Sequence, residues 1–201
     1  MSERLRDEPL DGRLIHLCVD MQRIFSHEGV WATPWMERVL PVVARIVEKH
    51  PQRTIFTRFI TPMQPQDMRG RWISYYQKWR QTTRQFMDPA MLDLVPELAR
   101  YCPPAQVIDK TVYSAFSNPA LLHSLKMRAV TGVIITGSET DVCVLASVLA
   151  AVDFGFRVIV VRDAVCSSSD AGHDAMMEIY HRRYSQQIET ADAETILKHW
   201  K

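Results

Sequence analysis

Three residues with complementary chemistry each follow a short apolar run of the chain, namely Asp20, Lys110 and Cys143. A thiol can act as a nucleophile, and a carboxylate can take up its proton and return it to a leaving group. An ammonium group can hold the carboxylate and stabilise negative charge. Each residue alone also has an ordinary structural explanation, as a turn residue, a solvated lysine or a small buried side chain. The chemistry therefore depends on whether the fold brings the three together.

Cys143 is the strongest candidate nucleophile among the four cysteines. It lies in the first turn of a helix predicted over residues 141–154, where the helix dipole is expected to lower the pKa of the thiol. The preceding residues 137–140 (GSET) predict a tight turn whose backbone N–H groups could hold an oxyanion beside the sulfur. The other three cysteines fall inside a predicted strand or in loops, with no helix N-terminus clearly attached.

Apolar runs and amphipathic stretches alternate along the chain. Strands are predicted over residues 14–19, 53–59, 105–109, 131–136, 157–161 and 187–189. Helices are predicted over residues 34–49, 141–154 and 169–184, with a last helix ending near residue 199. This alternation indicates a three-layer α/β/α, Rossmann-like domain around a parallel sheet. Because ligands of such sheets bind at the carboxyl ends of the strands, the three candidate residues are expected at the binding edge.

Residues 60–90 differ from the rest of the chain in being rich in aromatic residues, methionine, arginine and proline. The spacing of Trp72, Tyr75, Tyr76 and Trp79 predicts a helix over residues 72–82 with its aromatic rings on one face. Two interpretations remain open. The helix packs on the core or on another subunit, or it forms a lid that supplies aromatic walls to a pocket.

The bulk composition excludes several classes of protein. With 24 basic and 23 acidic side chains the formal net charge is +1, so no basic surface suggests a nucleic-acid partner. No apolar run is long enough to cross a membrane, and the polar start of the chain does not resemble a secretory signal, which predicts a cytoplasmic protein. A length of 201 residues predicts a single domain over 1–201, with residues 1–12 as a flexible N-terminus and 60–90 as a lid or interface insertion.

Three segments resemble, in order and spacing, motifs of the isochorismatase-like superfamily of hydrolases. They are CVDMQRIF (18–25), DKTVYSAF (109–116) and ITGSETDVCVLASVLAAVDFGFRVIVVRDAV (135–165). The resemblance covers residues 14–190 and implies a six-stranded parallel sheet in the order 3-2-1-4-5-6.

The resemblance also implies roles for individual residues. Cys143, Asp20 and Lys110 would form the catalytic triad. The backbone N–H groups of Glu139 and Cys143 would form the oxyanion hole, next to a cis peptide bond between Ser138 and Glu139. Phe25 matches a position that lines the pocket in this superfamily.

The departures from the superfamily narrow the expected chemistry. Nicotinamidases of the superfamily bind a metal through an Asp-x-His pair and a further histidine, whereas residues 57–70 (TRFITPMQPQDMRG) contain no histidine and only Asp67 as an acid. We therefore predict no metal and no cofactor. Isochorismatases that cleave a vinyl ether generally lack the nucleophilic cysteine, so Cys143 counts against that reaction.

What remains is metal-independent hydrolysis of an amide-type, non-peptide C–N bond through an acyl-cysteine intermediate. The expected substrate is a small molecule, ureido or carboxylate-bearing, bound by Phe25, Arg58, Trp72 and Tyr113. Arginine is included because its guanidinium pairs well with carboxylates. The superfamily further implies a homodimer or homotetramer. The alternatives are an isochorismatase-type enol-ether hydrolase and a non-catalytic binding protein on the same fold.

Overall fold

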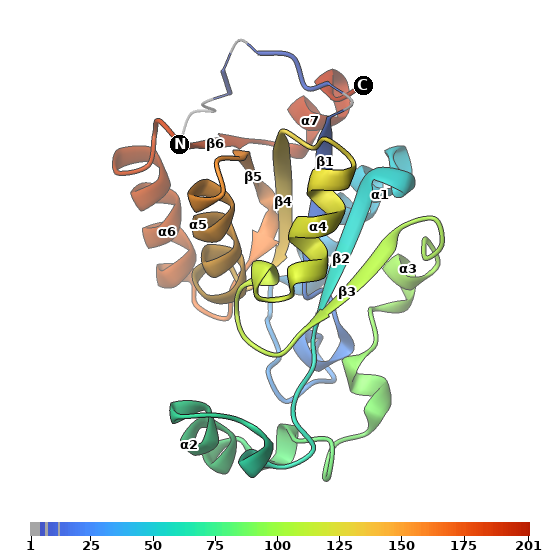
Figure 1. Ribbon diagram of the computed structural model, residues 1–201, viewed down its shortest axis with the longest axis vertical. Helices are drawn as coiled ribbons and strands as arrows, with labels where there is room; N and C mark the ends of the chain where they lie inside the picture. The colour runs from blue at the N-terminus through green and yellow to red at the C-terminus, as the bar shows by residue number, and fades with distance from the viewer. Residues whose placement is uncertain (1–4, 7, 12) are drawn as a thin grey trace.

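A six-stranded parallel sheet forms the centre of the computed structural model, which describes residues 5–6, 8–11 and 13–201 (Figure 1). Its strands are β1 (Leu14–Val19), β2 (Thr54–Phe59), β3 (Gln106–Lys110), β4 (Gly132–Ser138), β5 (Arg157–Cys166) and β6 (Ile188–Ala191). They pair in the order β3-β2-β1-β4-β5-β6, which confirms the predicted α/β fold and sheet order.

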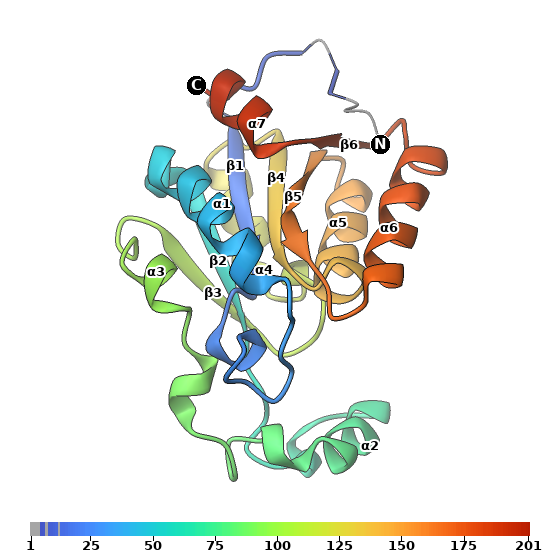
Figure 2. The ribbon, with the colours of Figure 1, turned by 180° about the vertical axis from the view of Figure 1, so that it is seen from behind.

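Helices cover both faces of this sheet. They are α1 (Met36–Lys49), α2 (Arg71–Lys78), α3 (Pro96–Ala99), α4 (Pro119–Met127), α5 (Leu145–Asp153), α6 (Asp170–Arg182) and α7 (Ala193–His199). Two opposite views show α4, α5 and α6 over one face and α1 and α7 over the other (Figures 1 and 2). Each face has its own apolar cluster, so the sheet is buried from both sides, as parallel sheets require.

The central strand β1 shows why such runs become buried strands. All six of its residues are buried, and the one polar residue among them, His16, has partners in both neighbouring strands. Its ring nitrogens lie 2.7 Å from Thr136 Oγ1 and 3.3 Å from Thr54 Oγ1. Burial lowers the pKa of His16 to about 3, so the imidazole is neutral inside the sheet.

Several boundaries differ from the predicted ones. β5 continues to Cys166 rather than ending at residue 161, because a register shift in its pairing with β4 lets the later residues pair again. The helix predicted over 141–154 begins with a π-helical turn, Thr140–Val144, before α5. The helix predicted over 72–82 is shorter, since α2 ends at Lys78 and a separate 3₁₀ turn follows.

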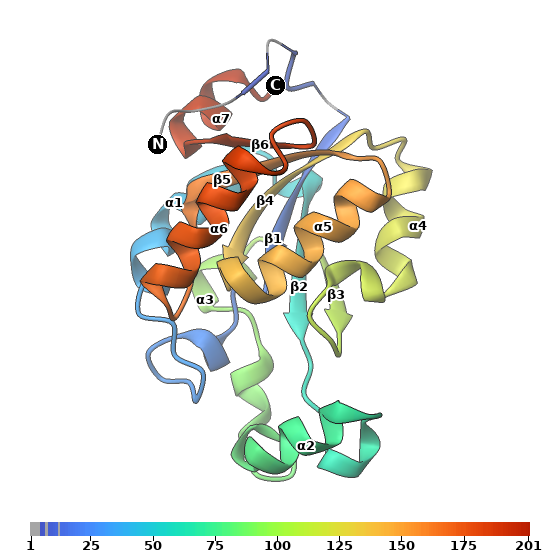
Figure 3. The same ribbon diagram turned by 90° about the vertical axis from the view of Figure 1, so that its left-hand side faces the viewer.

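The segment 60–90 lies apart from the sheet, beyond the carboxyl ends of its strands, as the side view shows (Figure 3). The chain's C-terminal end lies at the opposite end of the molecule, beside α7. The predicted flexible N-terminus falls in part on residues 1–4, 7 and 12, which lie outside the described residues. Of the described ones, Leu10 is buried and accepts a backbone hydrogen bond from Lys201. Within the described ranges no helix has both the length and the apolar character needed to cross a bilayer.

Candidate active site

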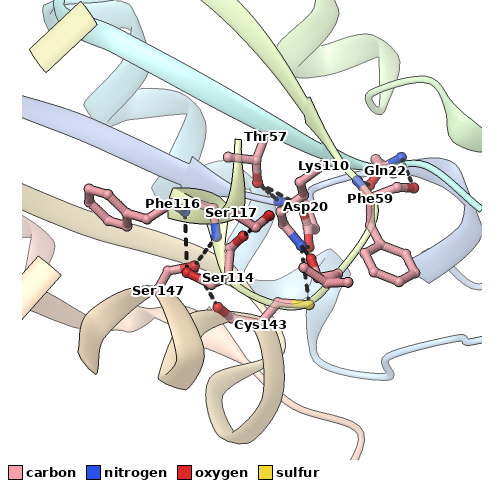
Figure 4. A network of polar contacts seen from close by, with 12 residues as sticks. Asp20, Gln22, Thr57, Phe59, Lys110, Ser114, Phe116, Ser117, Cys143 and Ser147 are labelled. Atoms are coloured by element: carbon pink, nitrogen blue, oxygen red, sulfur yellow. Dashed lines mark hydrogen bonds and ion pairs between the residues drawn. The ribbon is translucent and has the colours of Figure 1, made fainter. Parts of the chain in front are cut away.

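The carboxyl ends of β1, β3 and β4 bring Asp20, Lys110 and Cys143 to one place (Figure 4). β1 and β4 are neighbours in the sheet, and the strand order reverses between them. Such a reversal leaves a crevice at the carboxyl edge of an open α/β sheet, because the connections on either side lead to opposite faces. The three residues therefore lie where this type of fold binds ligands.

Asp20 is fully buried, and its carboxylate is held from two sides. Thr57 Oγ1 donates to Oδ1 at 2.6 Å, and Lys110 Nζ forms an ion pair with Oδ2 at 2.6 Å. The backbone of Asp20 has φ of 50°, in the left-handed region that short polar residues tolerate better than most. This conformation ends β1 and turns the carboxylate toward the other two members of the trio.

Lys110 connects the acid to the thiol. Besides the ion pair with Asp20, its ammonium group donates to the carbonyl of Val112 at 3.2 Å and to Cys143 Sγ at 3.5 Å. The ammonium also lies 4.8 Å from the centre of the Phe59 ring. A lysine has three N–H donors, and all three have a partner here. The group is therefore fixed between a carboxylate and a sulfur, although its side chain is fully buried.

The turn before Cys143 depends on a glycine. Gly137 has φ of 111°, and a Cβ at this position would lie 2.1 Å from the carbonyl oxygen of Val19 in β1. No other residue type fits there without moving one of the strands. The peptide bond between Ser138 and Glu139 is cis, as the resemblance implied. Cys143 follows in the π-helical turn, with 6% of its surface exposed.

The pKa of the Cys143 thiol is raised well above its usual value, so the prediction of a lowered pKa is wrong. Burial is the largest cause, and the negative charge of Asp20 adds to it, while Lys110 opposes both. The thiol is almost fully removed from water and faces a carboxylate. These two effects on the pKa exceed that of the helix dipole. The thiol is therefore protonated at neutral pH, and an attack by sulfur requires a base close by.

Cys143 lies in the wall of a cavity of about 450 Å³, within the usual range for small-molecule sites. Six aromatic residues contribute to its lining, namely Phe25, Trp31, Phe59, Tyr75, Trp79 and Tyr113. The remaining lining residues are Val30, Ala32, Glu139, Val142 and Ser168. Two of the four predicted substrate-binding residues, Phe25 and Tyr113, thus face the cavity.

Residues 15–192 match the family model of the isochorismatase domain. The chain belongs to the isochorismatase family. The fold is similar to the solved structure of a cysteine hydrolase from Pseudomonas syringae pv. phaseolicola 1448A, with a TM-score of 0.82 and 21% sequence identity. The match covers 98% of this chain and 96% of that one. An N-carbamoylsarcosine amidase from Thermoplasma acidophilum is also similar (TM-score 0.73, 20% identity, 90% of this chain and 96% of that one). At these identities the likeness concerns the fold.

Two curated relatives of this isochorismatase-family protein carry different names. A maleamate amidohydrolase from Pseudomonas putida is 33% identical over 119 residues, which cover 55% of this chain and 56% of that protein. The match therefore spans about half the length of that relative. A probable inactive nicotinamidase from Arabidopsis thaliana is 28% identical over 182 residues, which cover 87% of this chain and 88% of that one.

The structure does not bring the other two predicted substrate-binding residues to the cavity lining. Arg58 is opposite Asp109 in the β2–β3 register and pairs with its carboxylate at 2.8 and 3.0 Å, and with Asp93 at 3.2 Å. Its guanidinium thus already has two acidic partners outside the lining of this cavity. Trp72 packs behind the lining instead, with its ring 4.8 Å from that of Tyr113.

Four of the aromatic cavity residues were not predicted as binding residues, namely Trp31, Phe59, Tyr75 and Trp79. Tyr75 and Trp79 belong to the regularly spaced aromatic residues for which a lid was one interpretation. This spacing was the signal in the sequence that could have identified them as cavity residues. Among the described residues, no group of three or more His, Cys, Asp or Glu side chains is placed to hold a metal ion. Asp67 instead accepts a hydrogen bond from the backbone N–H of Gln64 in a local capping box.

Proposed function

We propose that this isochorismatase-family protein is a cysteine hydrolase that cleaves an amide-type C–N bond of a small molecule. The observation that carries the proposal is the position of the Lys110 ammonium, 2.6 Å from Asp20 and 3.5 Å from Cys143 Sγ, beside the 450 Å³ cavity. Buried charged groups beside a thiol have little structural benefit, since such pairs seldom add net stability. Their cost is understandable if they perform chemistry.

The first half of the reaction forms an acyl-enzyme. Cys143 Sγ attacks the carbonyl carbon of the amide, and its proton passes to Asp20. The carbonyl oxygen becomes an oxyanion, which the backbone N–H groups of Glu139 and Cys143 stabilise. When the C–N bond breaks, Asp20 gives its proton to the leaving nitrogen, which departs as ammonia or an amine. Lys110 keeps Asp20 oriented throughout.

The second half returns the enzyme to its starting state. A water molecule attacks the thioester carbon, and Asp20 accepts one of its protons. The C–S bond breaks, the product leaves as a carboxylic acid, and the proton on Asp20 returns to the sulfur. The raised pKa of the thiol fits this cycle, because a sulfur that is protonated at rest needs Asp20 as its base.

The names of two similar proteins support an amide substrate, since one is a maleamate amidohydrolase and another an N-carbamoylsarcosine amidase. A carboxylate-bearing substrate has less support in this chain. Neither arginine nor lysine lines the cavity within the described residues, and the charged lining residue is Glu139.

The test is ammonia release from a panel of primary amides, ureido acids and nicotinamide, followed with a coupled dehydrogenase assay. Wild-type protein should hydrolyse at least one class, and both Cys143→Ala and Cys143→Ser should lose this activity. Cys102→Ala is the matched control, because that half-buried thiol lies outside the cavity and its loss should leave turnover unchanged. Undiminished ammonia release by Cys143→Ser would contradict the role of Cys143 as the nucleophile.

A further inference from the structure

The aromatic rings of the cavity pack on one another, some stacked and some at steep angles. The Trp31 ring lies 6.1 Å from that of Trp79 at an interplanar angle of 75°, and 6.1 Å from that of Tyr75 at 46°. Phe25 stacks on Trp31 at 5.9 Å. Phe59 stacks on Tyr113 at 6.5 Å and 16°, and it lies 6.0 Å from Trp31 at 60°. These six rings line the cavity together, and we call them the aromatic box.

The charge of this box comes from Glu139. It is the one charged residue among those that line the cavity in the described part of the chain. Asp20 and Lys110 lie behind the surface with no exposed side-chain area, and their charges oppose each other as an ion pair. Ser168 Oγ donates to Oε2 of Glu139 at 2.8 Å, which orients the carboxylate without neutralising it. The cavity therefore carries a negative charge next to several π faces.

We propose that the amide cleaved here carries a cationic, alkylated ammonium group, held between the aromatic box and the Glu139 carboxylate. This inference rests on the proposed function and names the substrate class for the same site. Cations are attracted to the faces of Trp, Tyr and Phe rings, and quaternary ammonium groups are recognised by cages of such rings. An anionic substrate would meet Glu139 without a compensating cation, and a neutral one would gain burial alone.

Nearby groups agree with this assignment. Burial raises the pKa of Tyr75 and of Tyr113, so both phenols stay neutral and do not change the charge of the box. Lys78 Nζ lies 5.7 Å from the centre of the Trp79 ring, although Lys78 itself is not part of the lining. The Trp79 ring thus already interacts with one cation of this chain.

The reaction balances with water as the second reactant. For trimethylammonioacetamide, Cys143 displaces ammonia to form the thioester of trimethylammonioacetic acid. Water then cleaves the C–S bond and releases trimethylammonioacetate, a proton and the free enzyme. The ammonium group takes no part in bond making and serves only to bind and position the acyl end.

The test uses pairs of molecules that differ only in charge. Trimethylammonioacetamide and 3,3-dimethylbutanamide have the same shape, with N⁺ replaced by carbon. Wild-type protein should favour the cation by about tenfold in kcat/KM, the size expected of one or two cation–π contacts. Glu139→Gln and Trp79→Leu should each reduce this ratio by about threefold or more. Glu178→Gln removes an exposed acid of α6 and should leave the ratio at the wild-type value.

A binding measurement separates this inference from the proposed function. Cys143→Ala is titrated with choline and with its neutral analogue 3,3-dimethylbutan-1-ol, and the fluorescence of Trp31 and Trp79 reports occupancy. Tighter binding of choline supports the cationic site even if no amide is hydrolysed. Equal or tighter binding of the neutral alcohol overturns the inference. Faster turnover of 3,3-dimethylbutanamide or of the anionic succinamate than of trimethylammonioacetamide would also overturn the inference. In that case the assignment as an amidase still stands.

Discussion

Replacing Lys110 by methionine should destabilise the fold strongly, because it leaves the carboxylate of Asp20 buried without its counter-ion. Methionine keeps the length and the apolar stem of the side chain, so the change is mainly the loss of charge. The two charged atoms lie 2.6 Å apart, and neither side chain is exposed to water. Thr57 Oγ1 still donates to the carboxylate in this variant.

The magnitude follows from the distance. At an effective dielectric constant of about 20, opposite unit charges 2.6 Å apart attract by about 6 kcal/mol. Part of this energy is recovered by relaxation and by the hydrogen bond from Thr57. Removing one partner of a buried pair typically costs about 3–5 kcal/mol, and we expect Lys110→Met to lower the free energy of unfolding by that amount. Asp20→Asn should cost a similar amount, because it leaves the ammonium group buried alone.

The two changes should not add. In the double variant neither charge remains, so its loss of unfolding free energy should be smaller than the sum of the two single losses by about 2 kcal/mol or more. The assay is urea unfolding at pH 7.5, followed by circular dichroism for wild type, both single variants and the double variant. Lys126→Met, which removes an exposed lysine of α4, should change stability by less than about 0.5 kcal/mol. Additive effects, or a loss below about 1 kcal/mol in Lys110→Met, would refute the reasoning.

Three further predictions concern the Cys143 thiol, the buried imidazole of His16 and the guanidinium of Arg58. Asp20→Asn should lower the pKa of Cys143, read as the midpoint of the pH dependence of its alkylation by iodoacetamide, since the carboxylate raises the pKa of the thiol; an unchanged or higher midpoint at the Cys143 peptide, measured by mass spectrometry, would be inconsistent with this electrostatic account. The pKa of His16 is about 3 in the folded protein and about 6.5 when unfolded, so the unfolded state binds more protons between these values and stability falls as the pH drops through this window. His16→Gln should therefore lose about 2 kcal/mol less than wild type between pH 7 and pH 5 in urea unfolding, and an identical pH dependence in the two proteins would show that the histidine is not buried neutral. Arg58→Ala should keep kcat/KM within about twofold for every hydrolysed amide, because its guanidinium pairs with acids outside the cavity; a large rise in KM for anionic amides would restore the carboxylate-binding role.

The fold could be predicted because its signals are local and agree with one another. The run Leu14–Val19 is too apolar for an exposed strand, and all its residues are buried. Polar residues directly after such strands must lie at one edge of a parallel sheet, which explains why Asp20, Lys110 and Cys143 could be placed together. The sheet order came from the resemblance, since no local pattern specifies which strands are neighbours.

The rest of the site depends on strand register, loop conformation and burial, which the spacing of residues along the sequence does not reveal. Arg58 lies in a strand that the sequence predicts. Its pairing with Asp109, however, depends on the register between β2 and β3, which the sequence does not show. Trp31 lies in an irregular loop, held by a backbone hydrogen bond to Ile24 and by the rings that Trp31 contacts. The pKa of Cys143 depends on how completely the turn is covered, and the helix dipole alone predicted the wrong sign.

The central claim is that Cys143 forms a covalent bond to the substrate with Asp20 as its base, and mass spectrometry of acid-quenched turnover tests it most directly. Protein mixed with an amide that it hydrolyses should gain the mass of the acyl group, on the peptide that contains Cys143, within the first turnover. Cys143→Ala should gain no mass and release no ammonia. Ammonia release by Cys143→Ala at the wild-type rate, with no acylated peptide in the wild-type protein, would contradict the account.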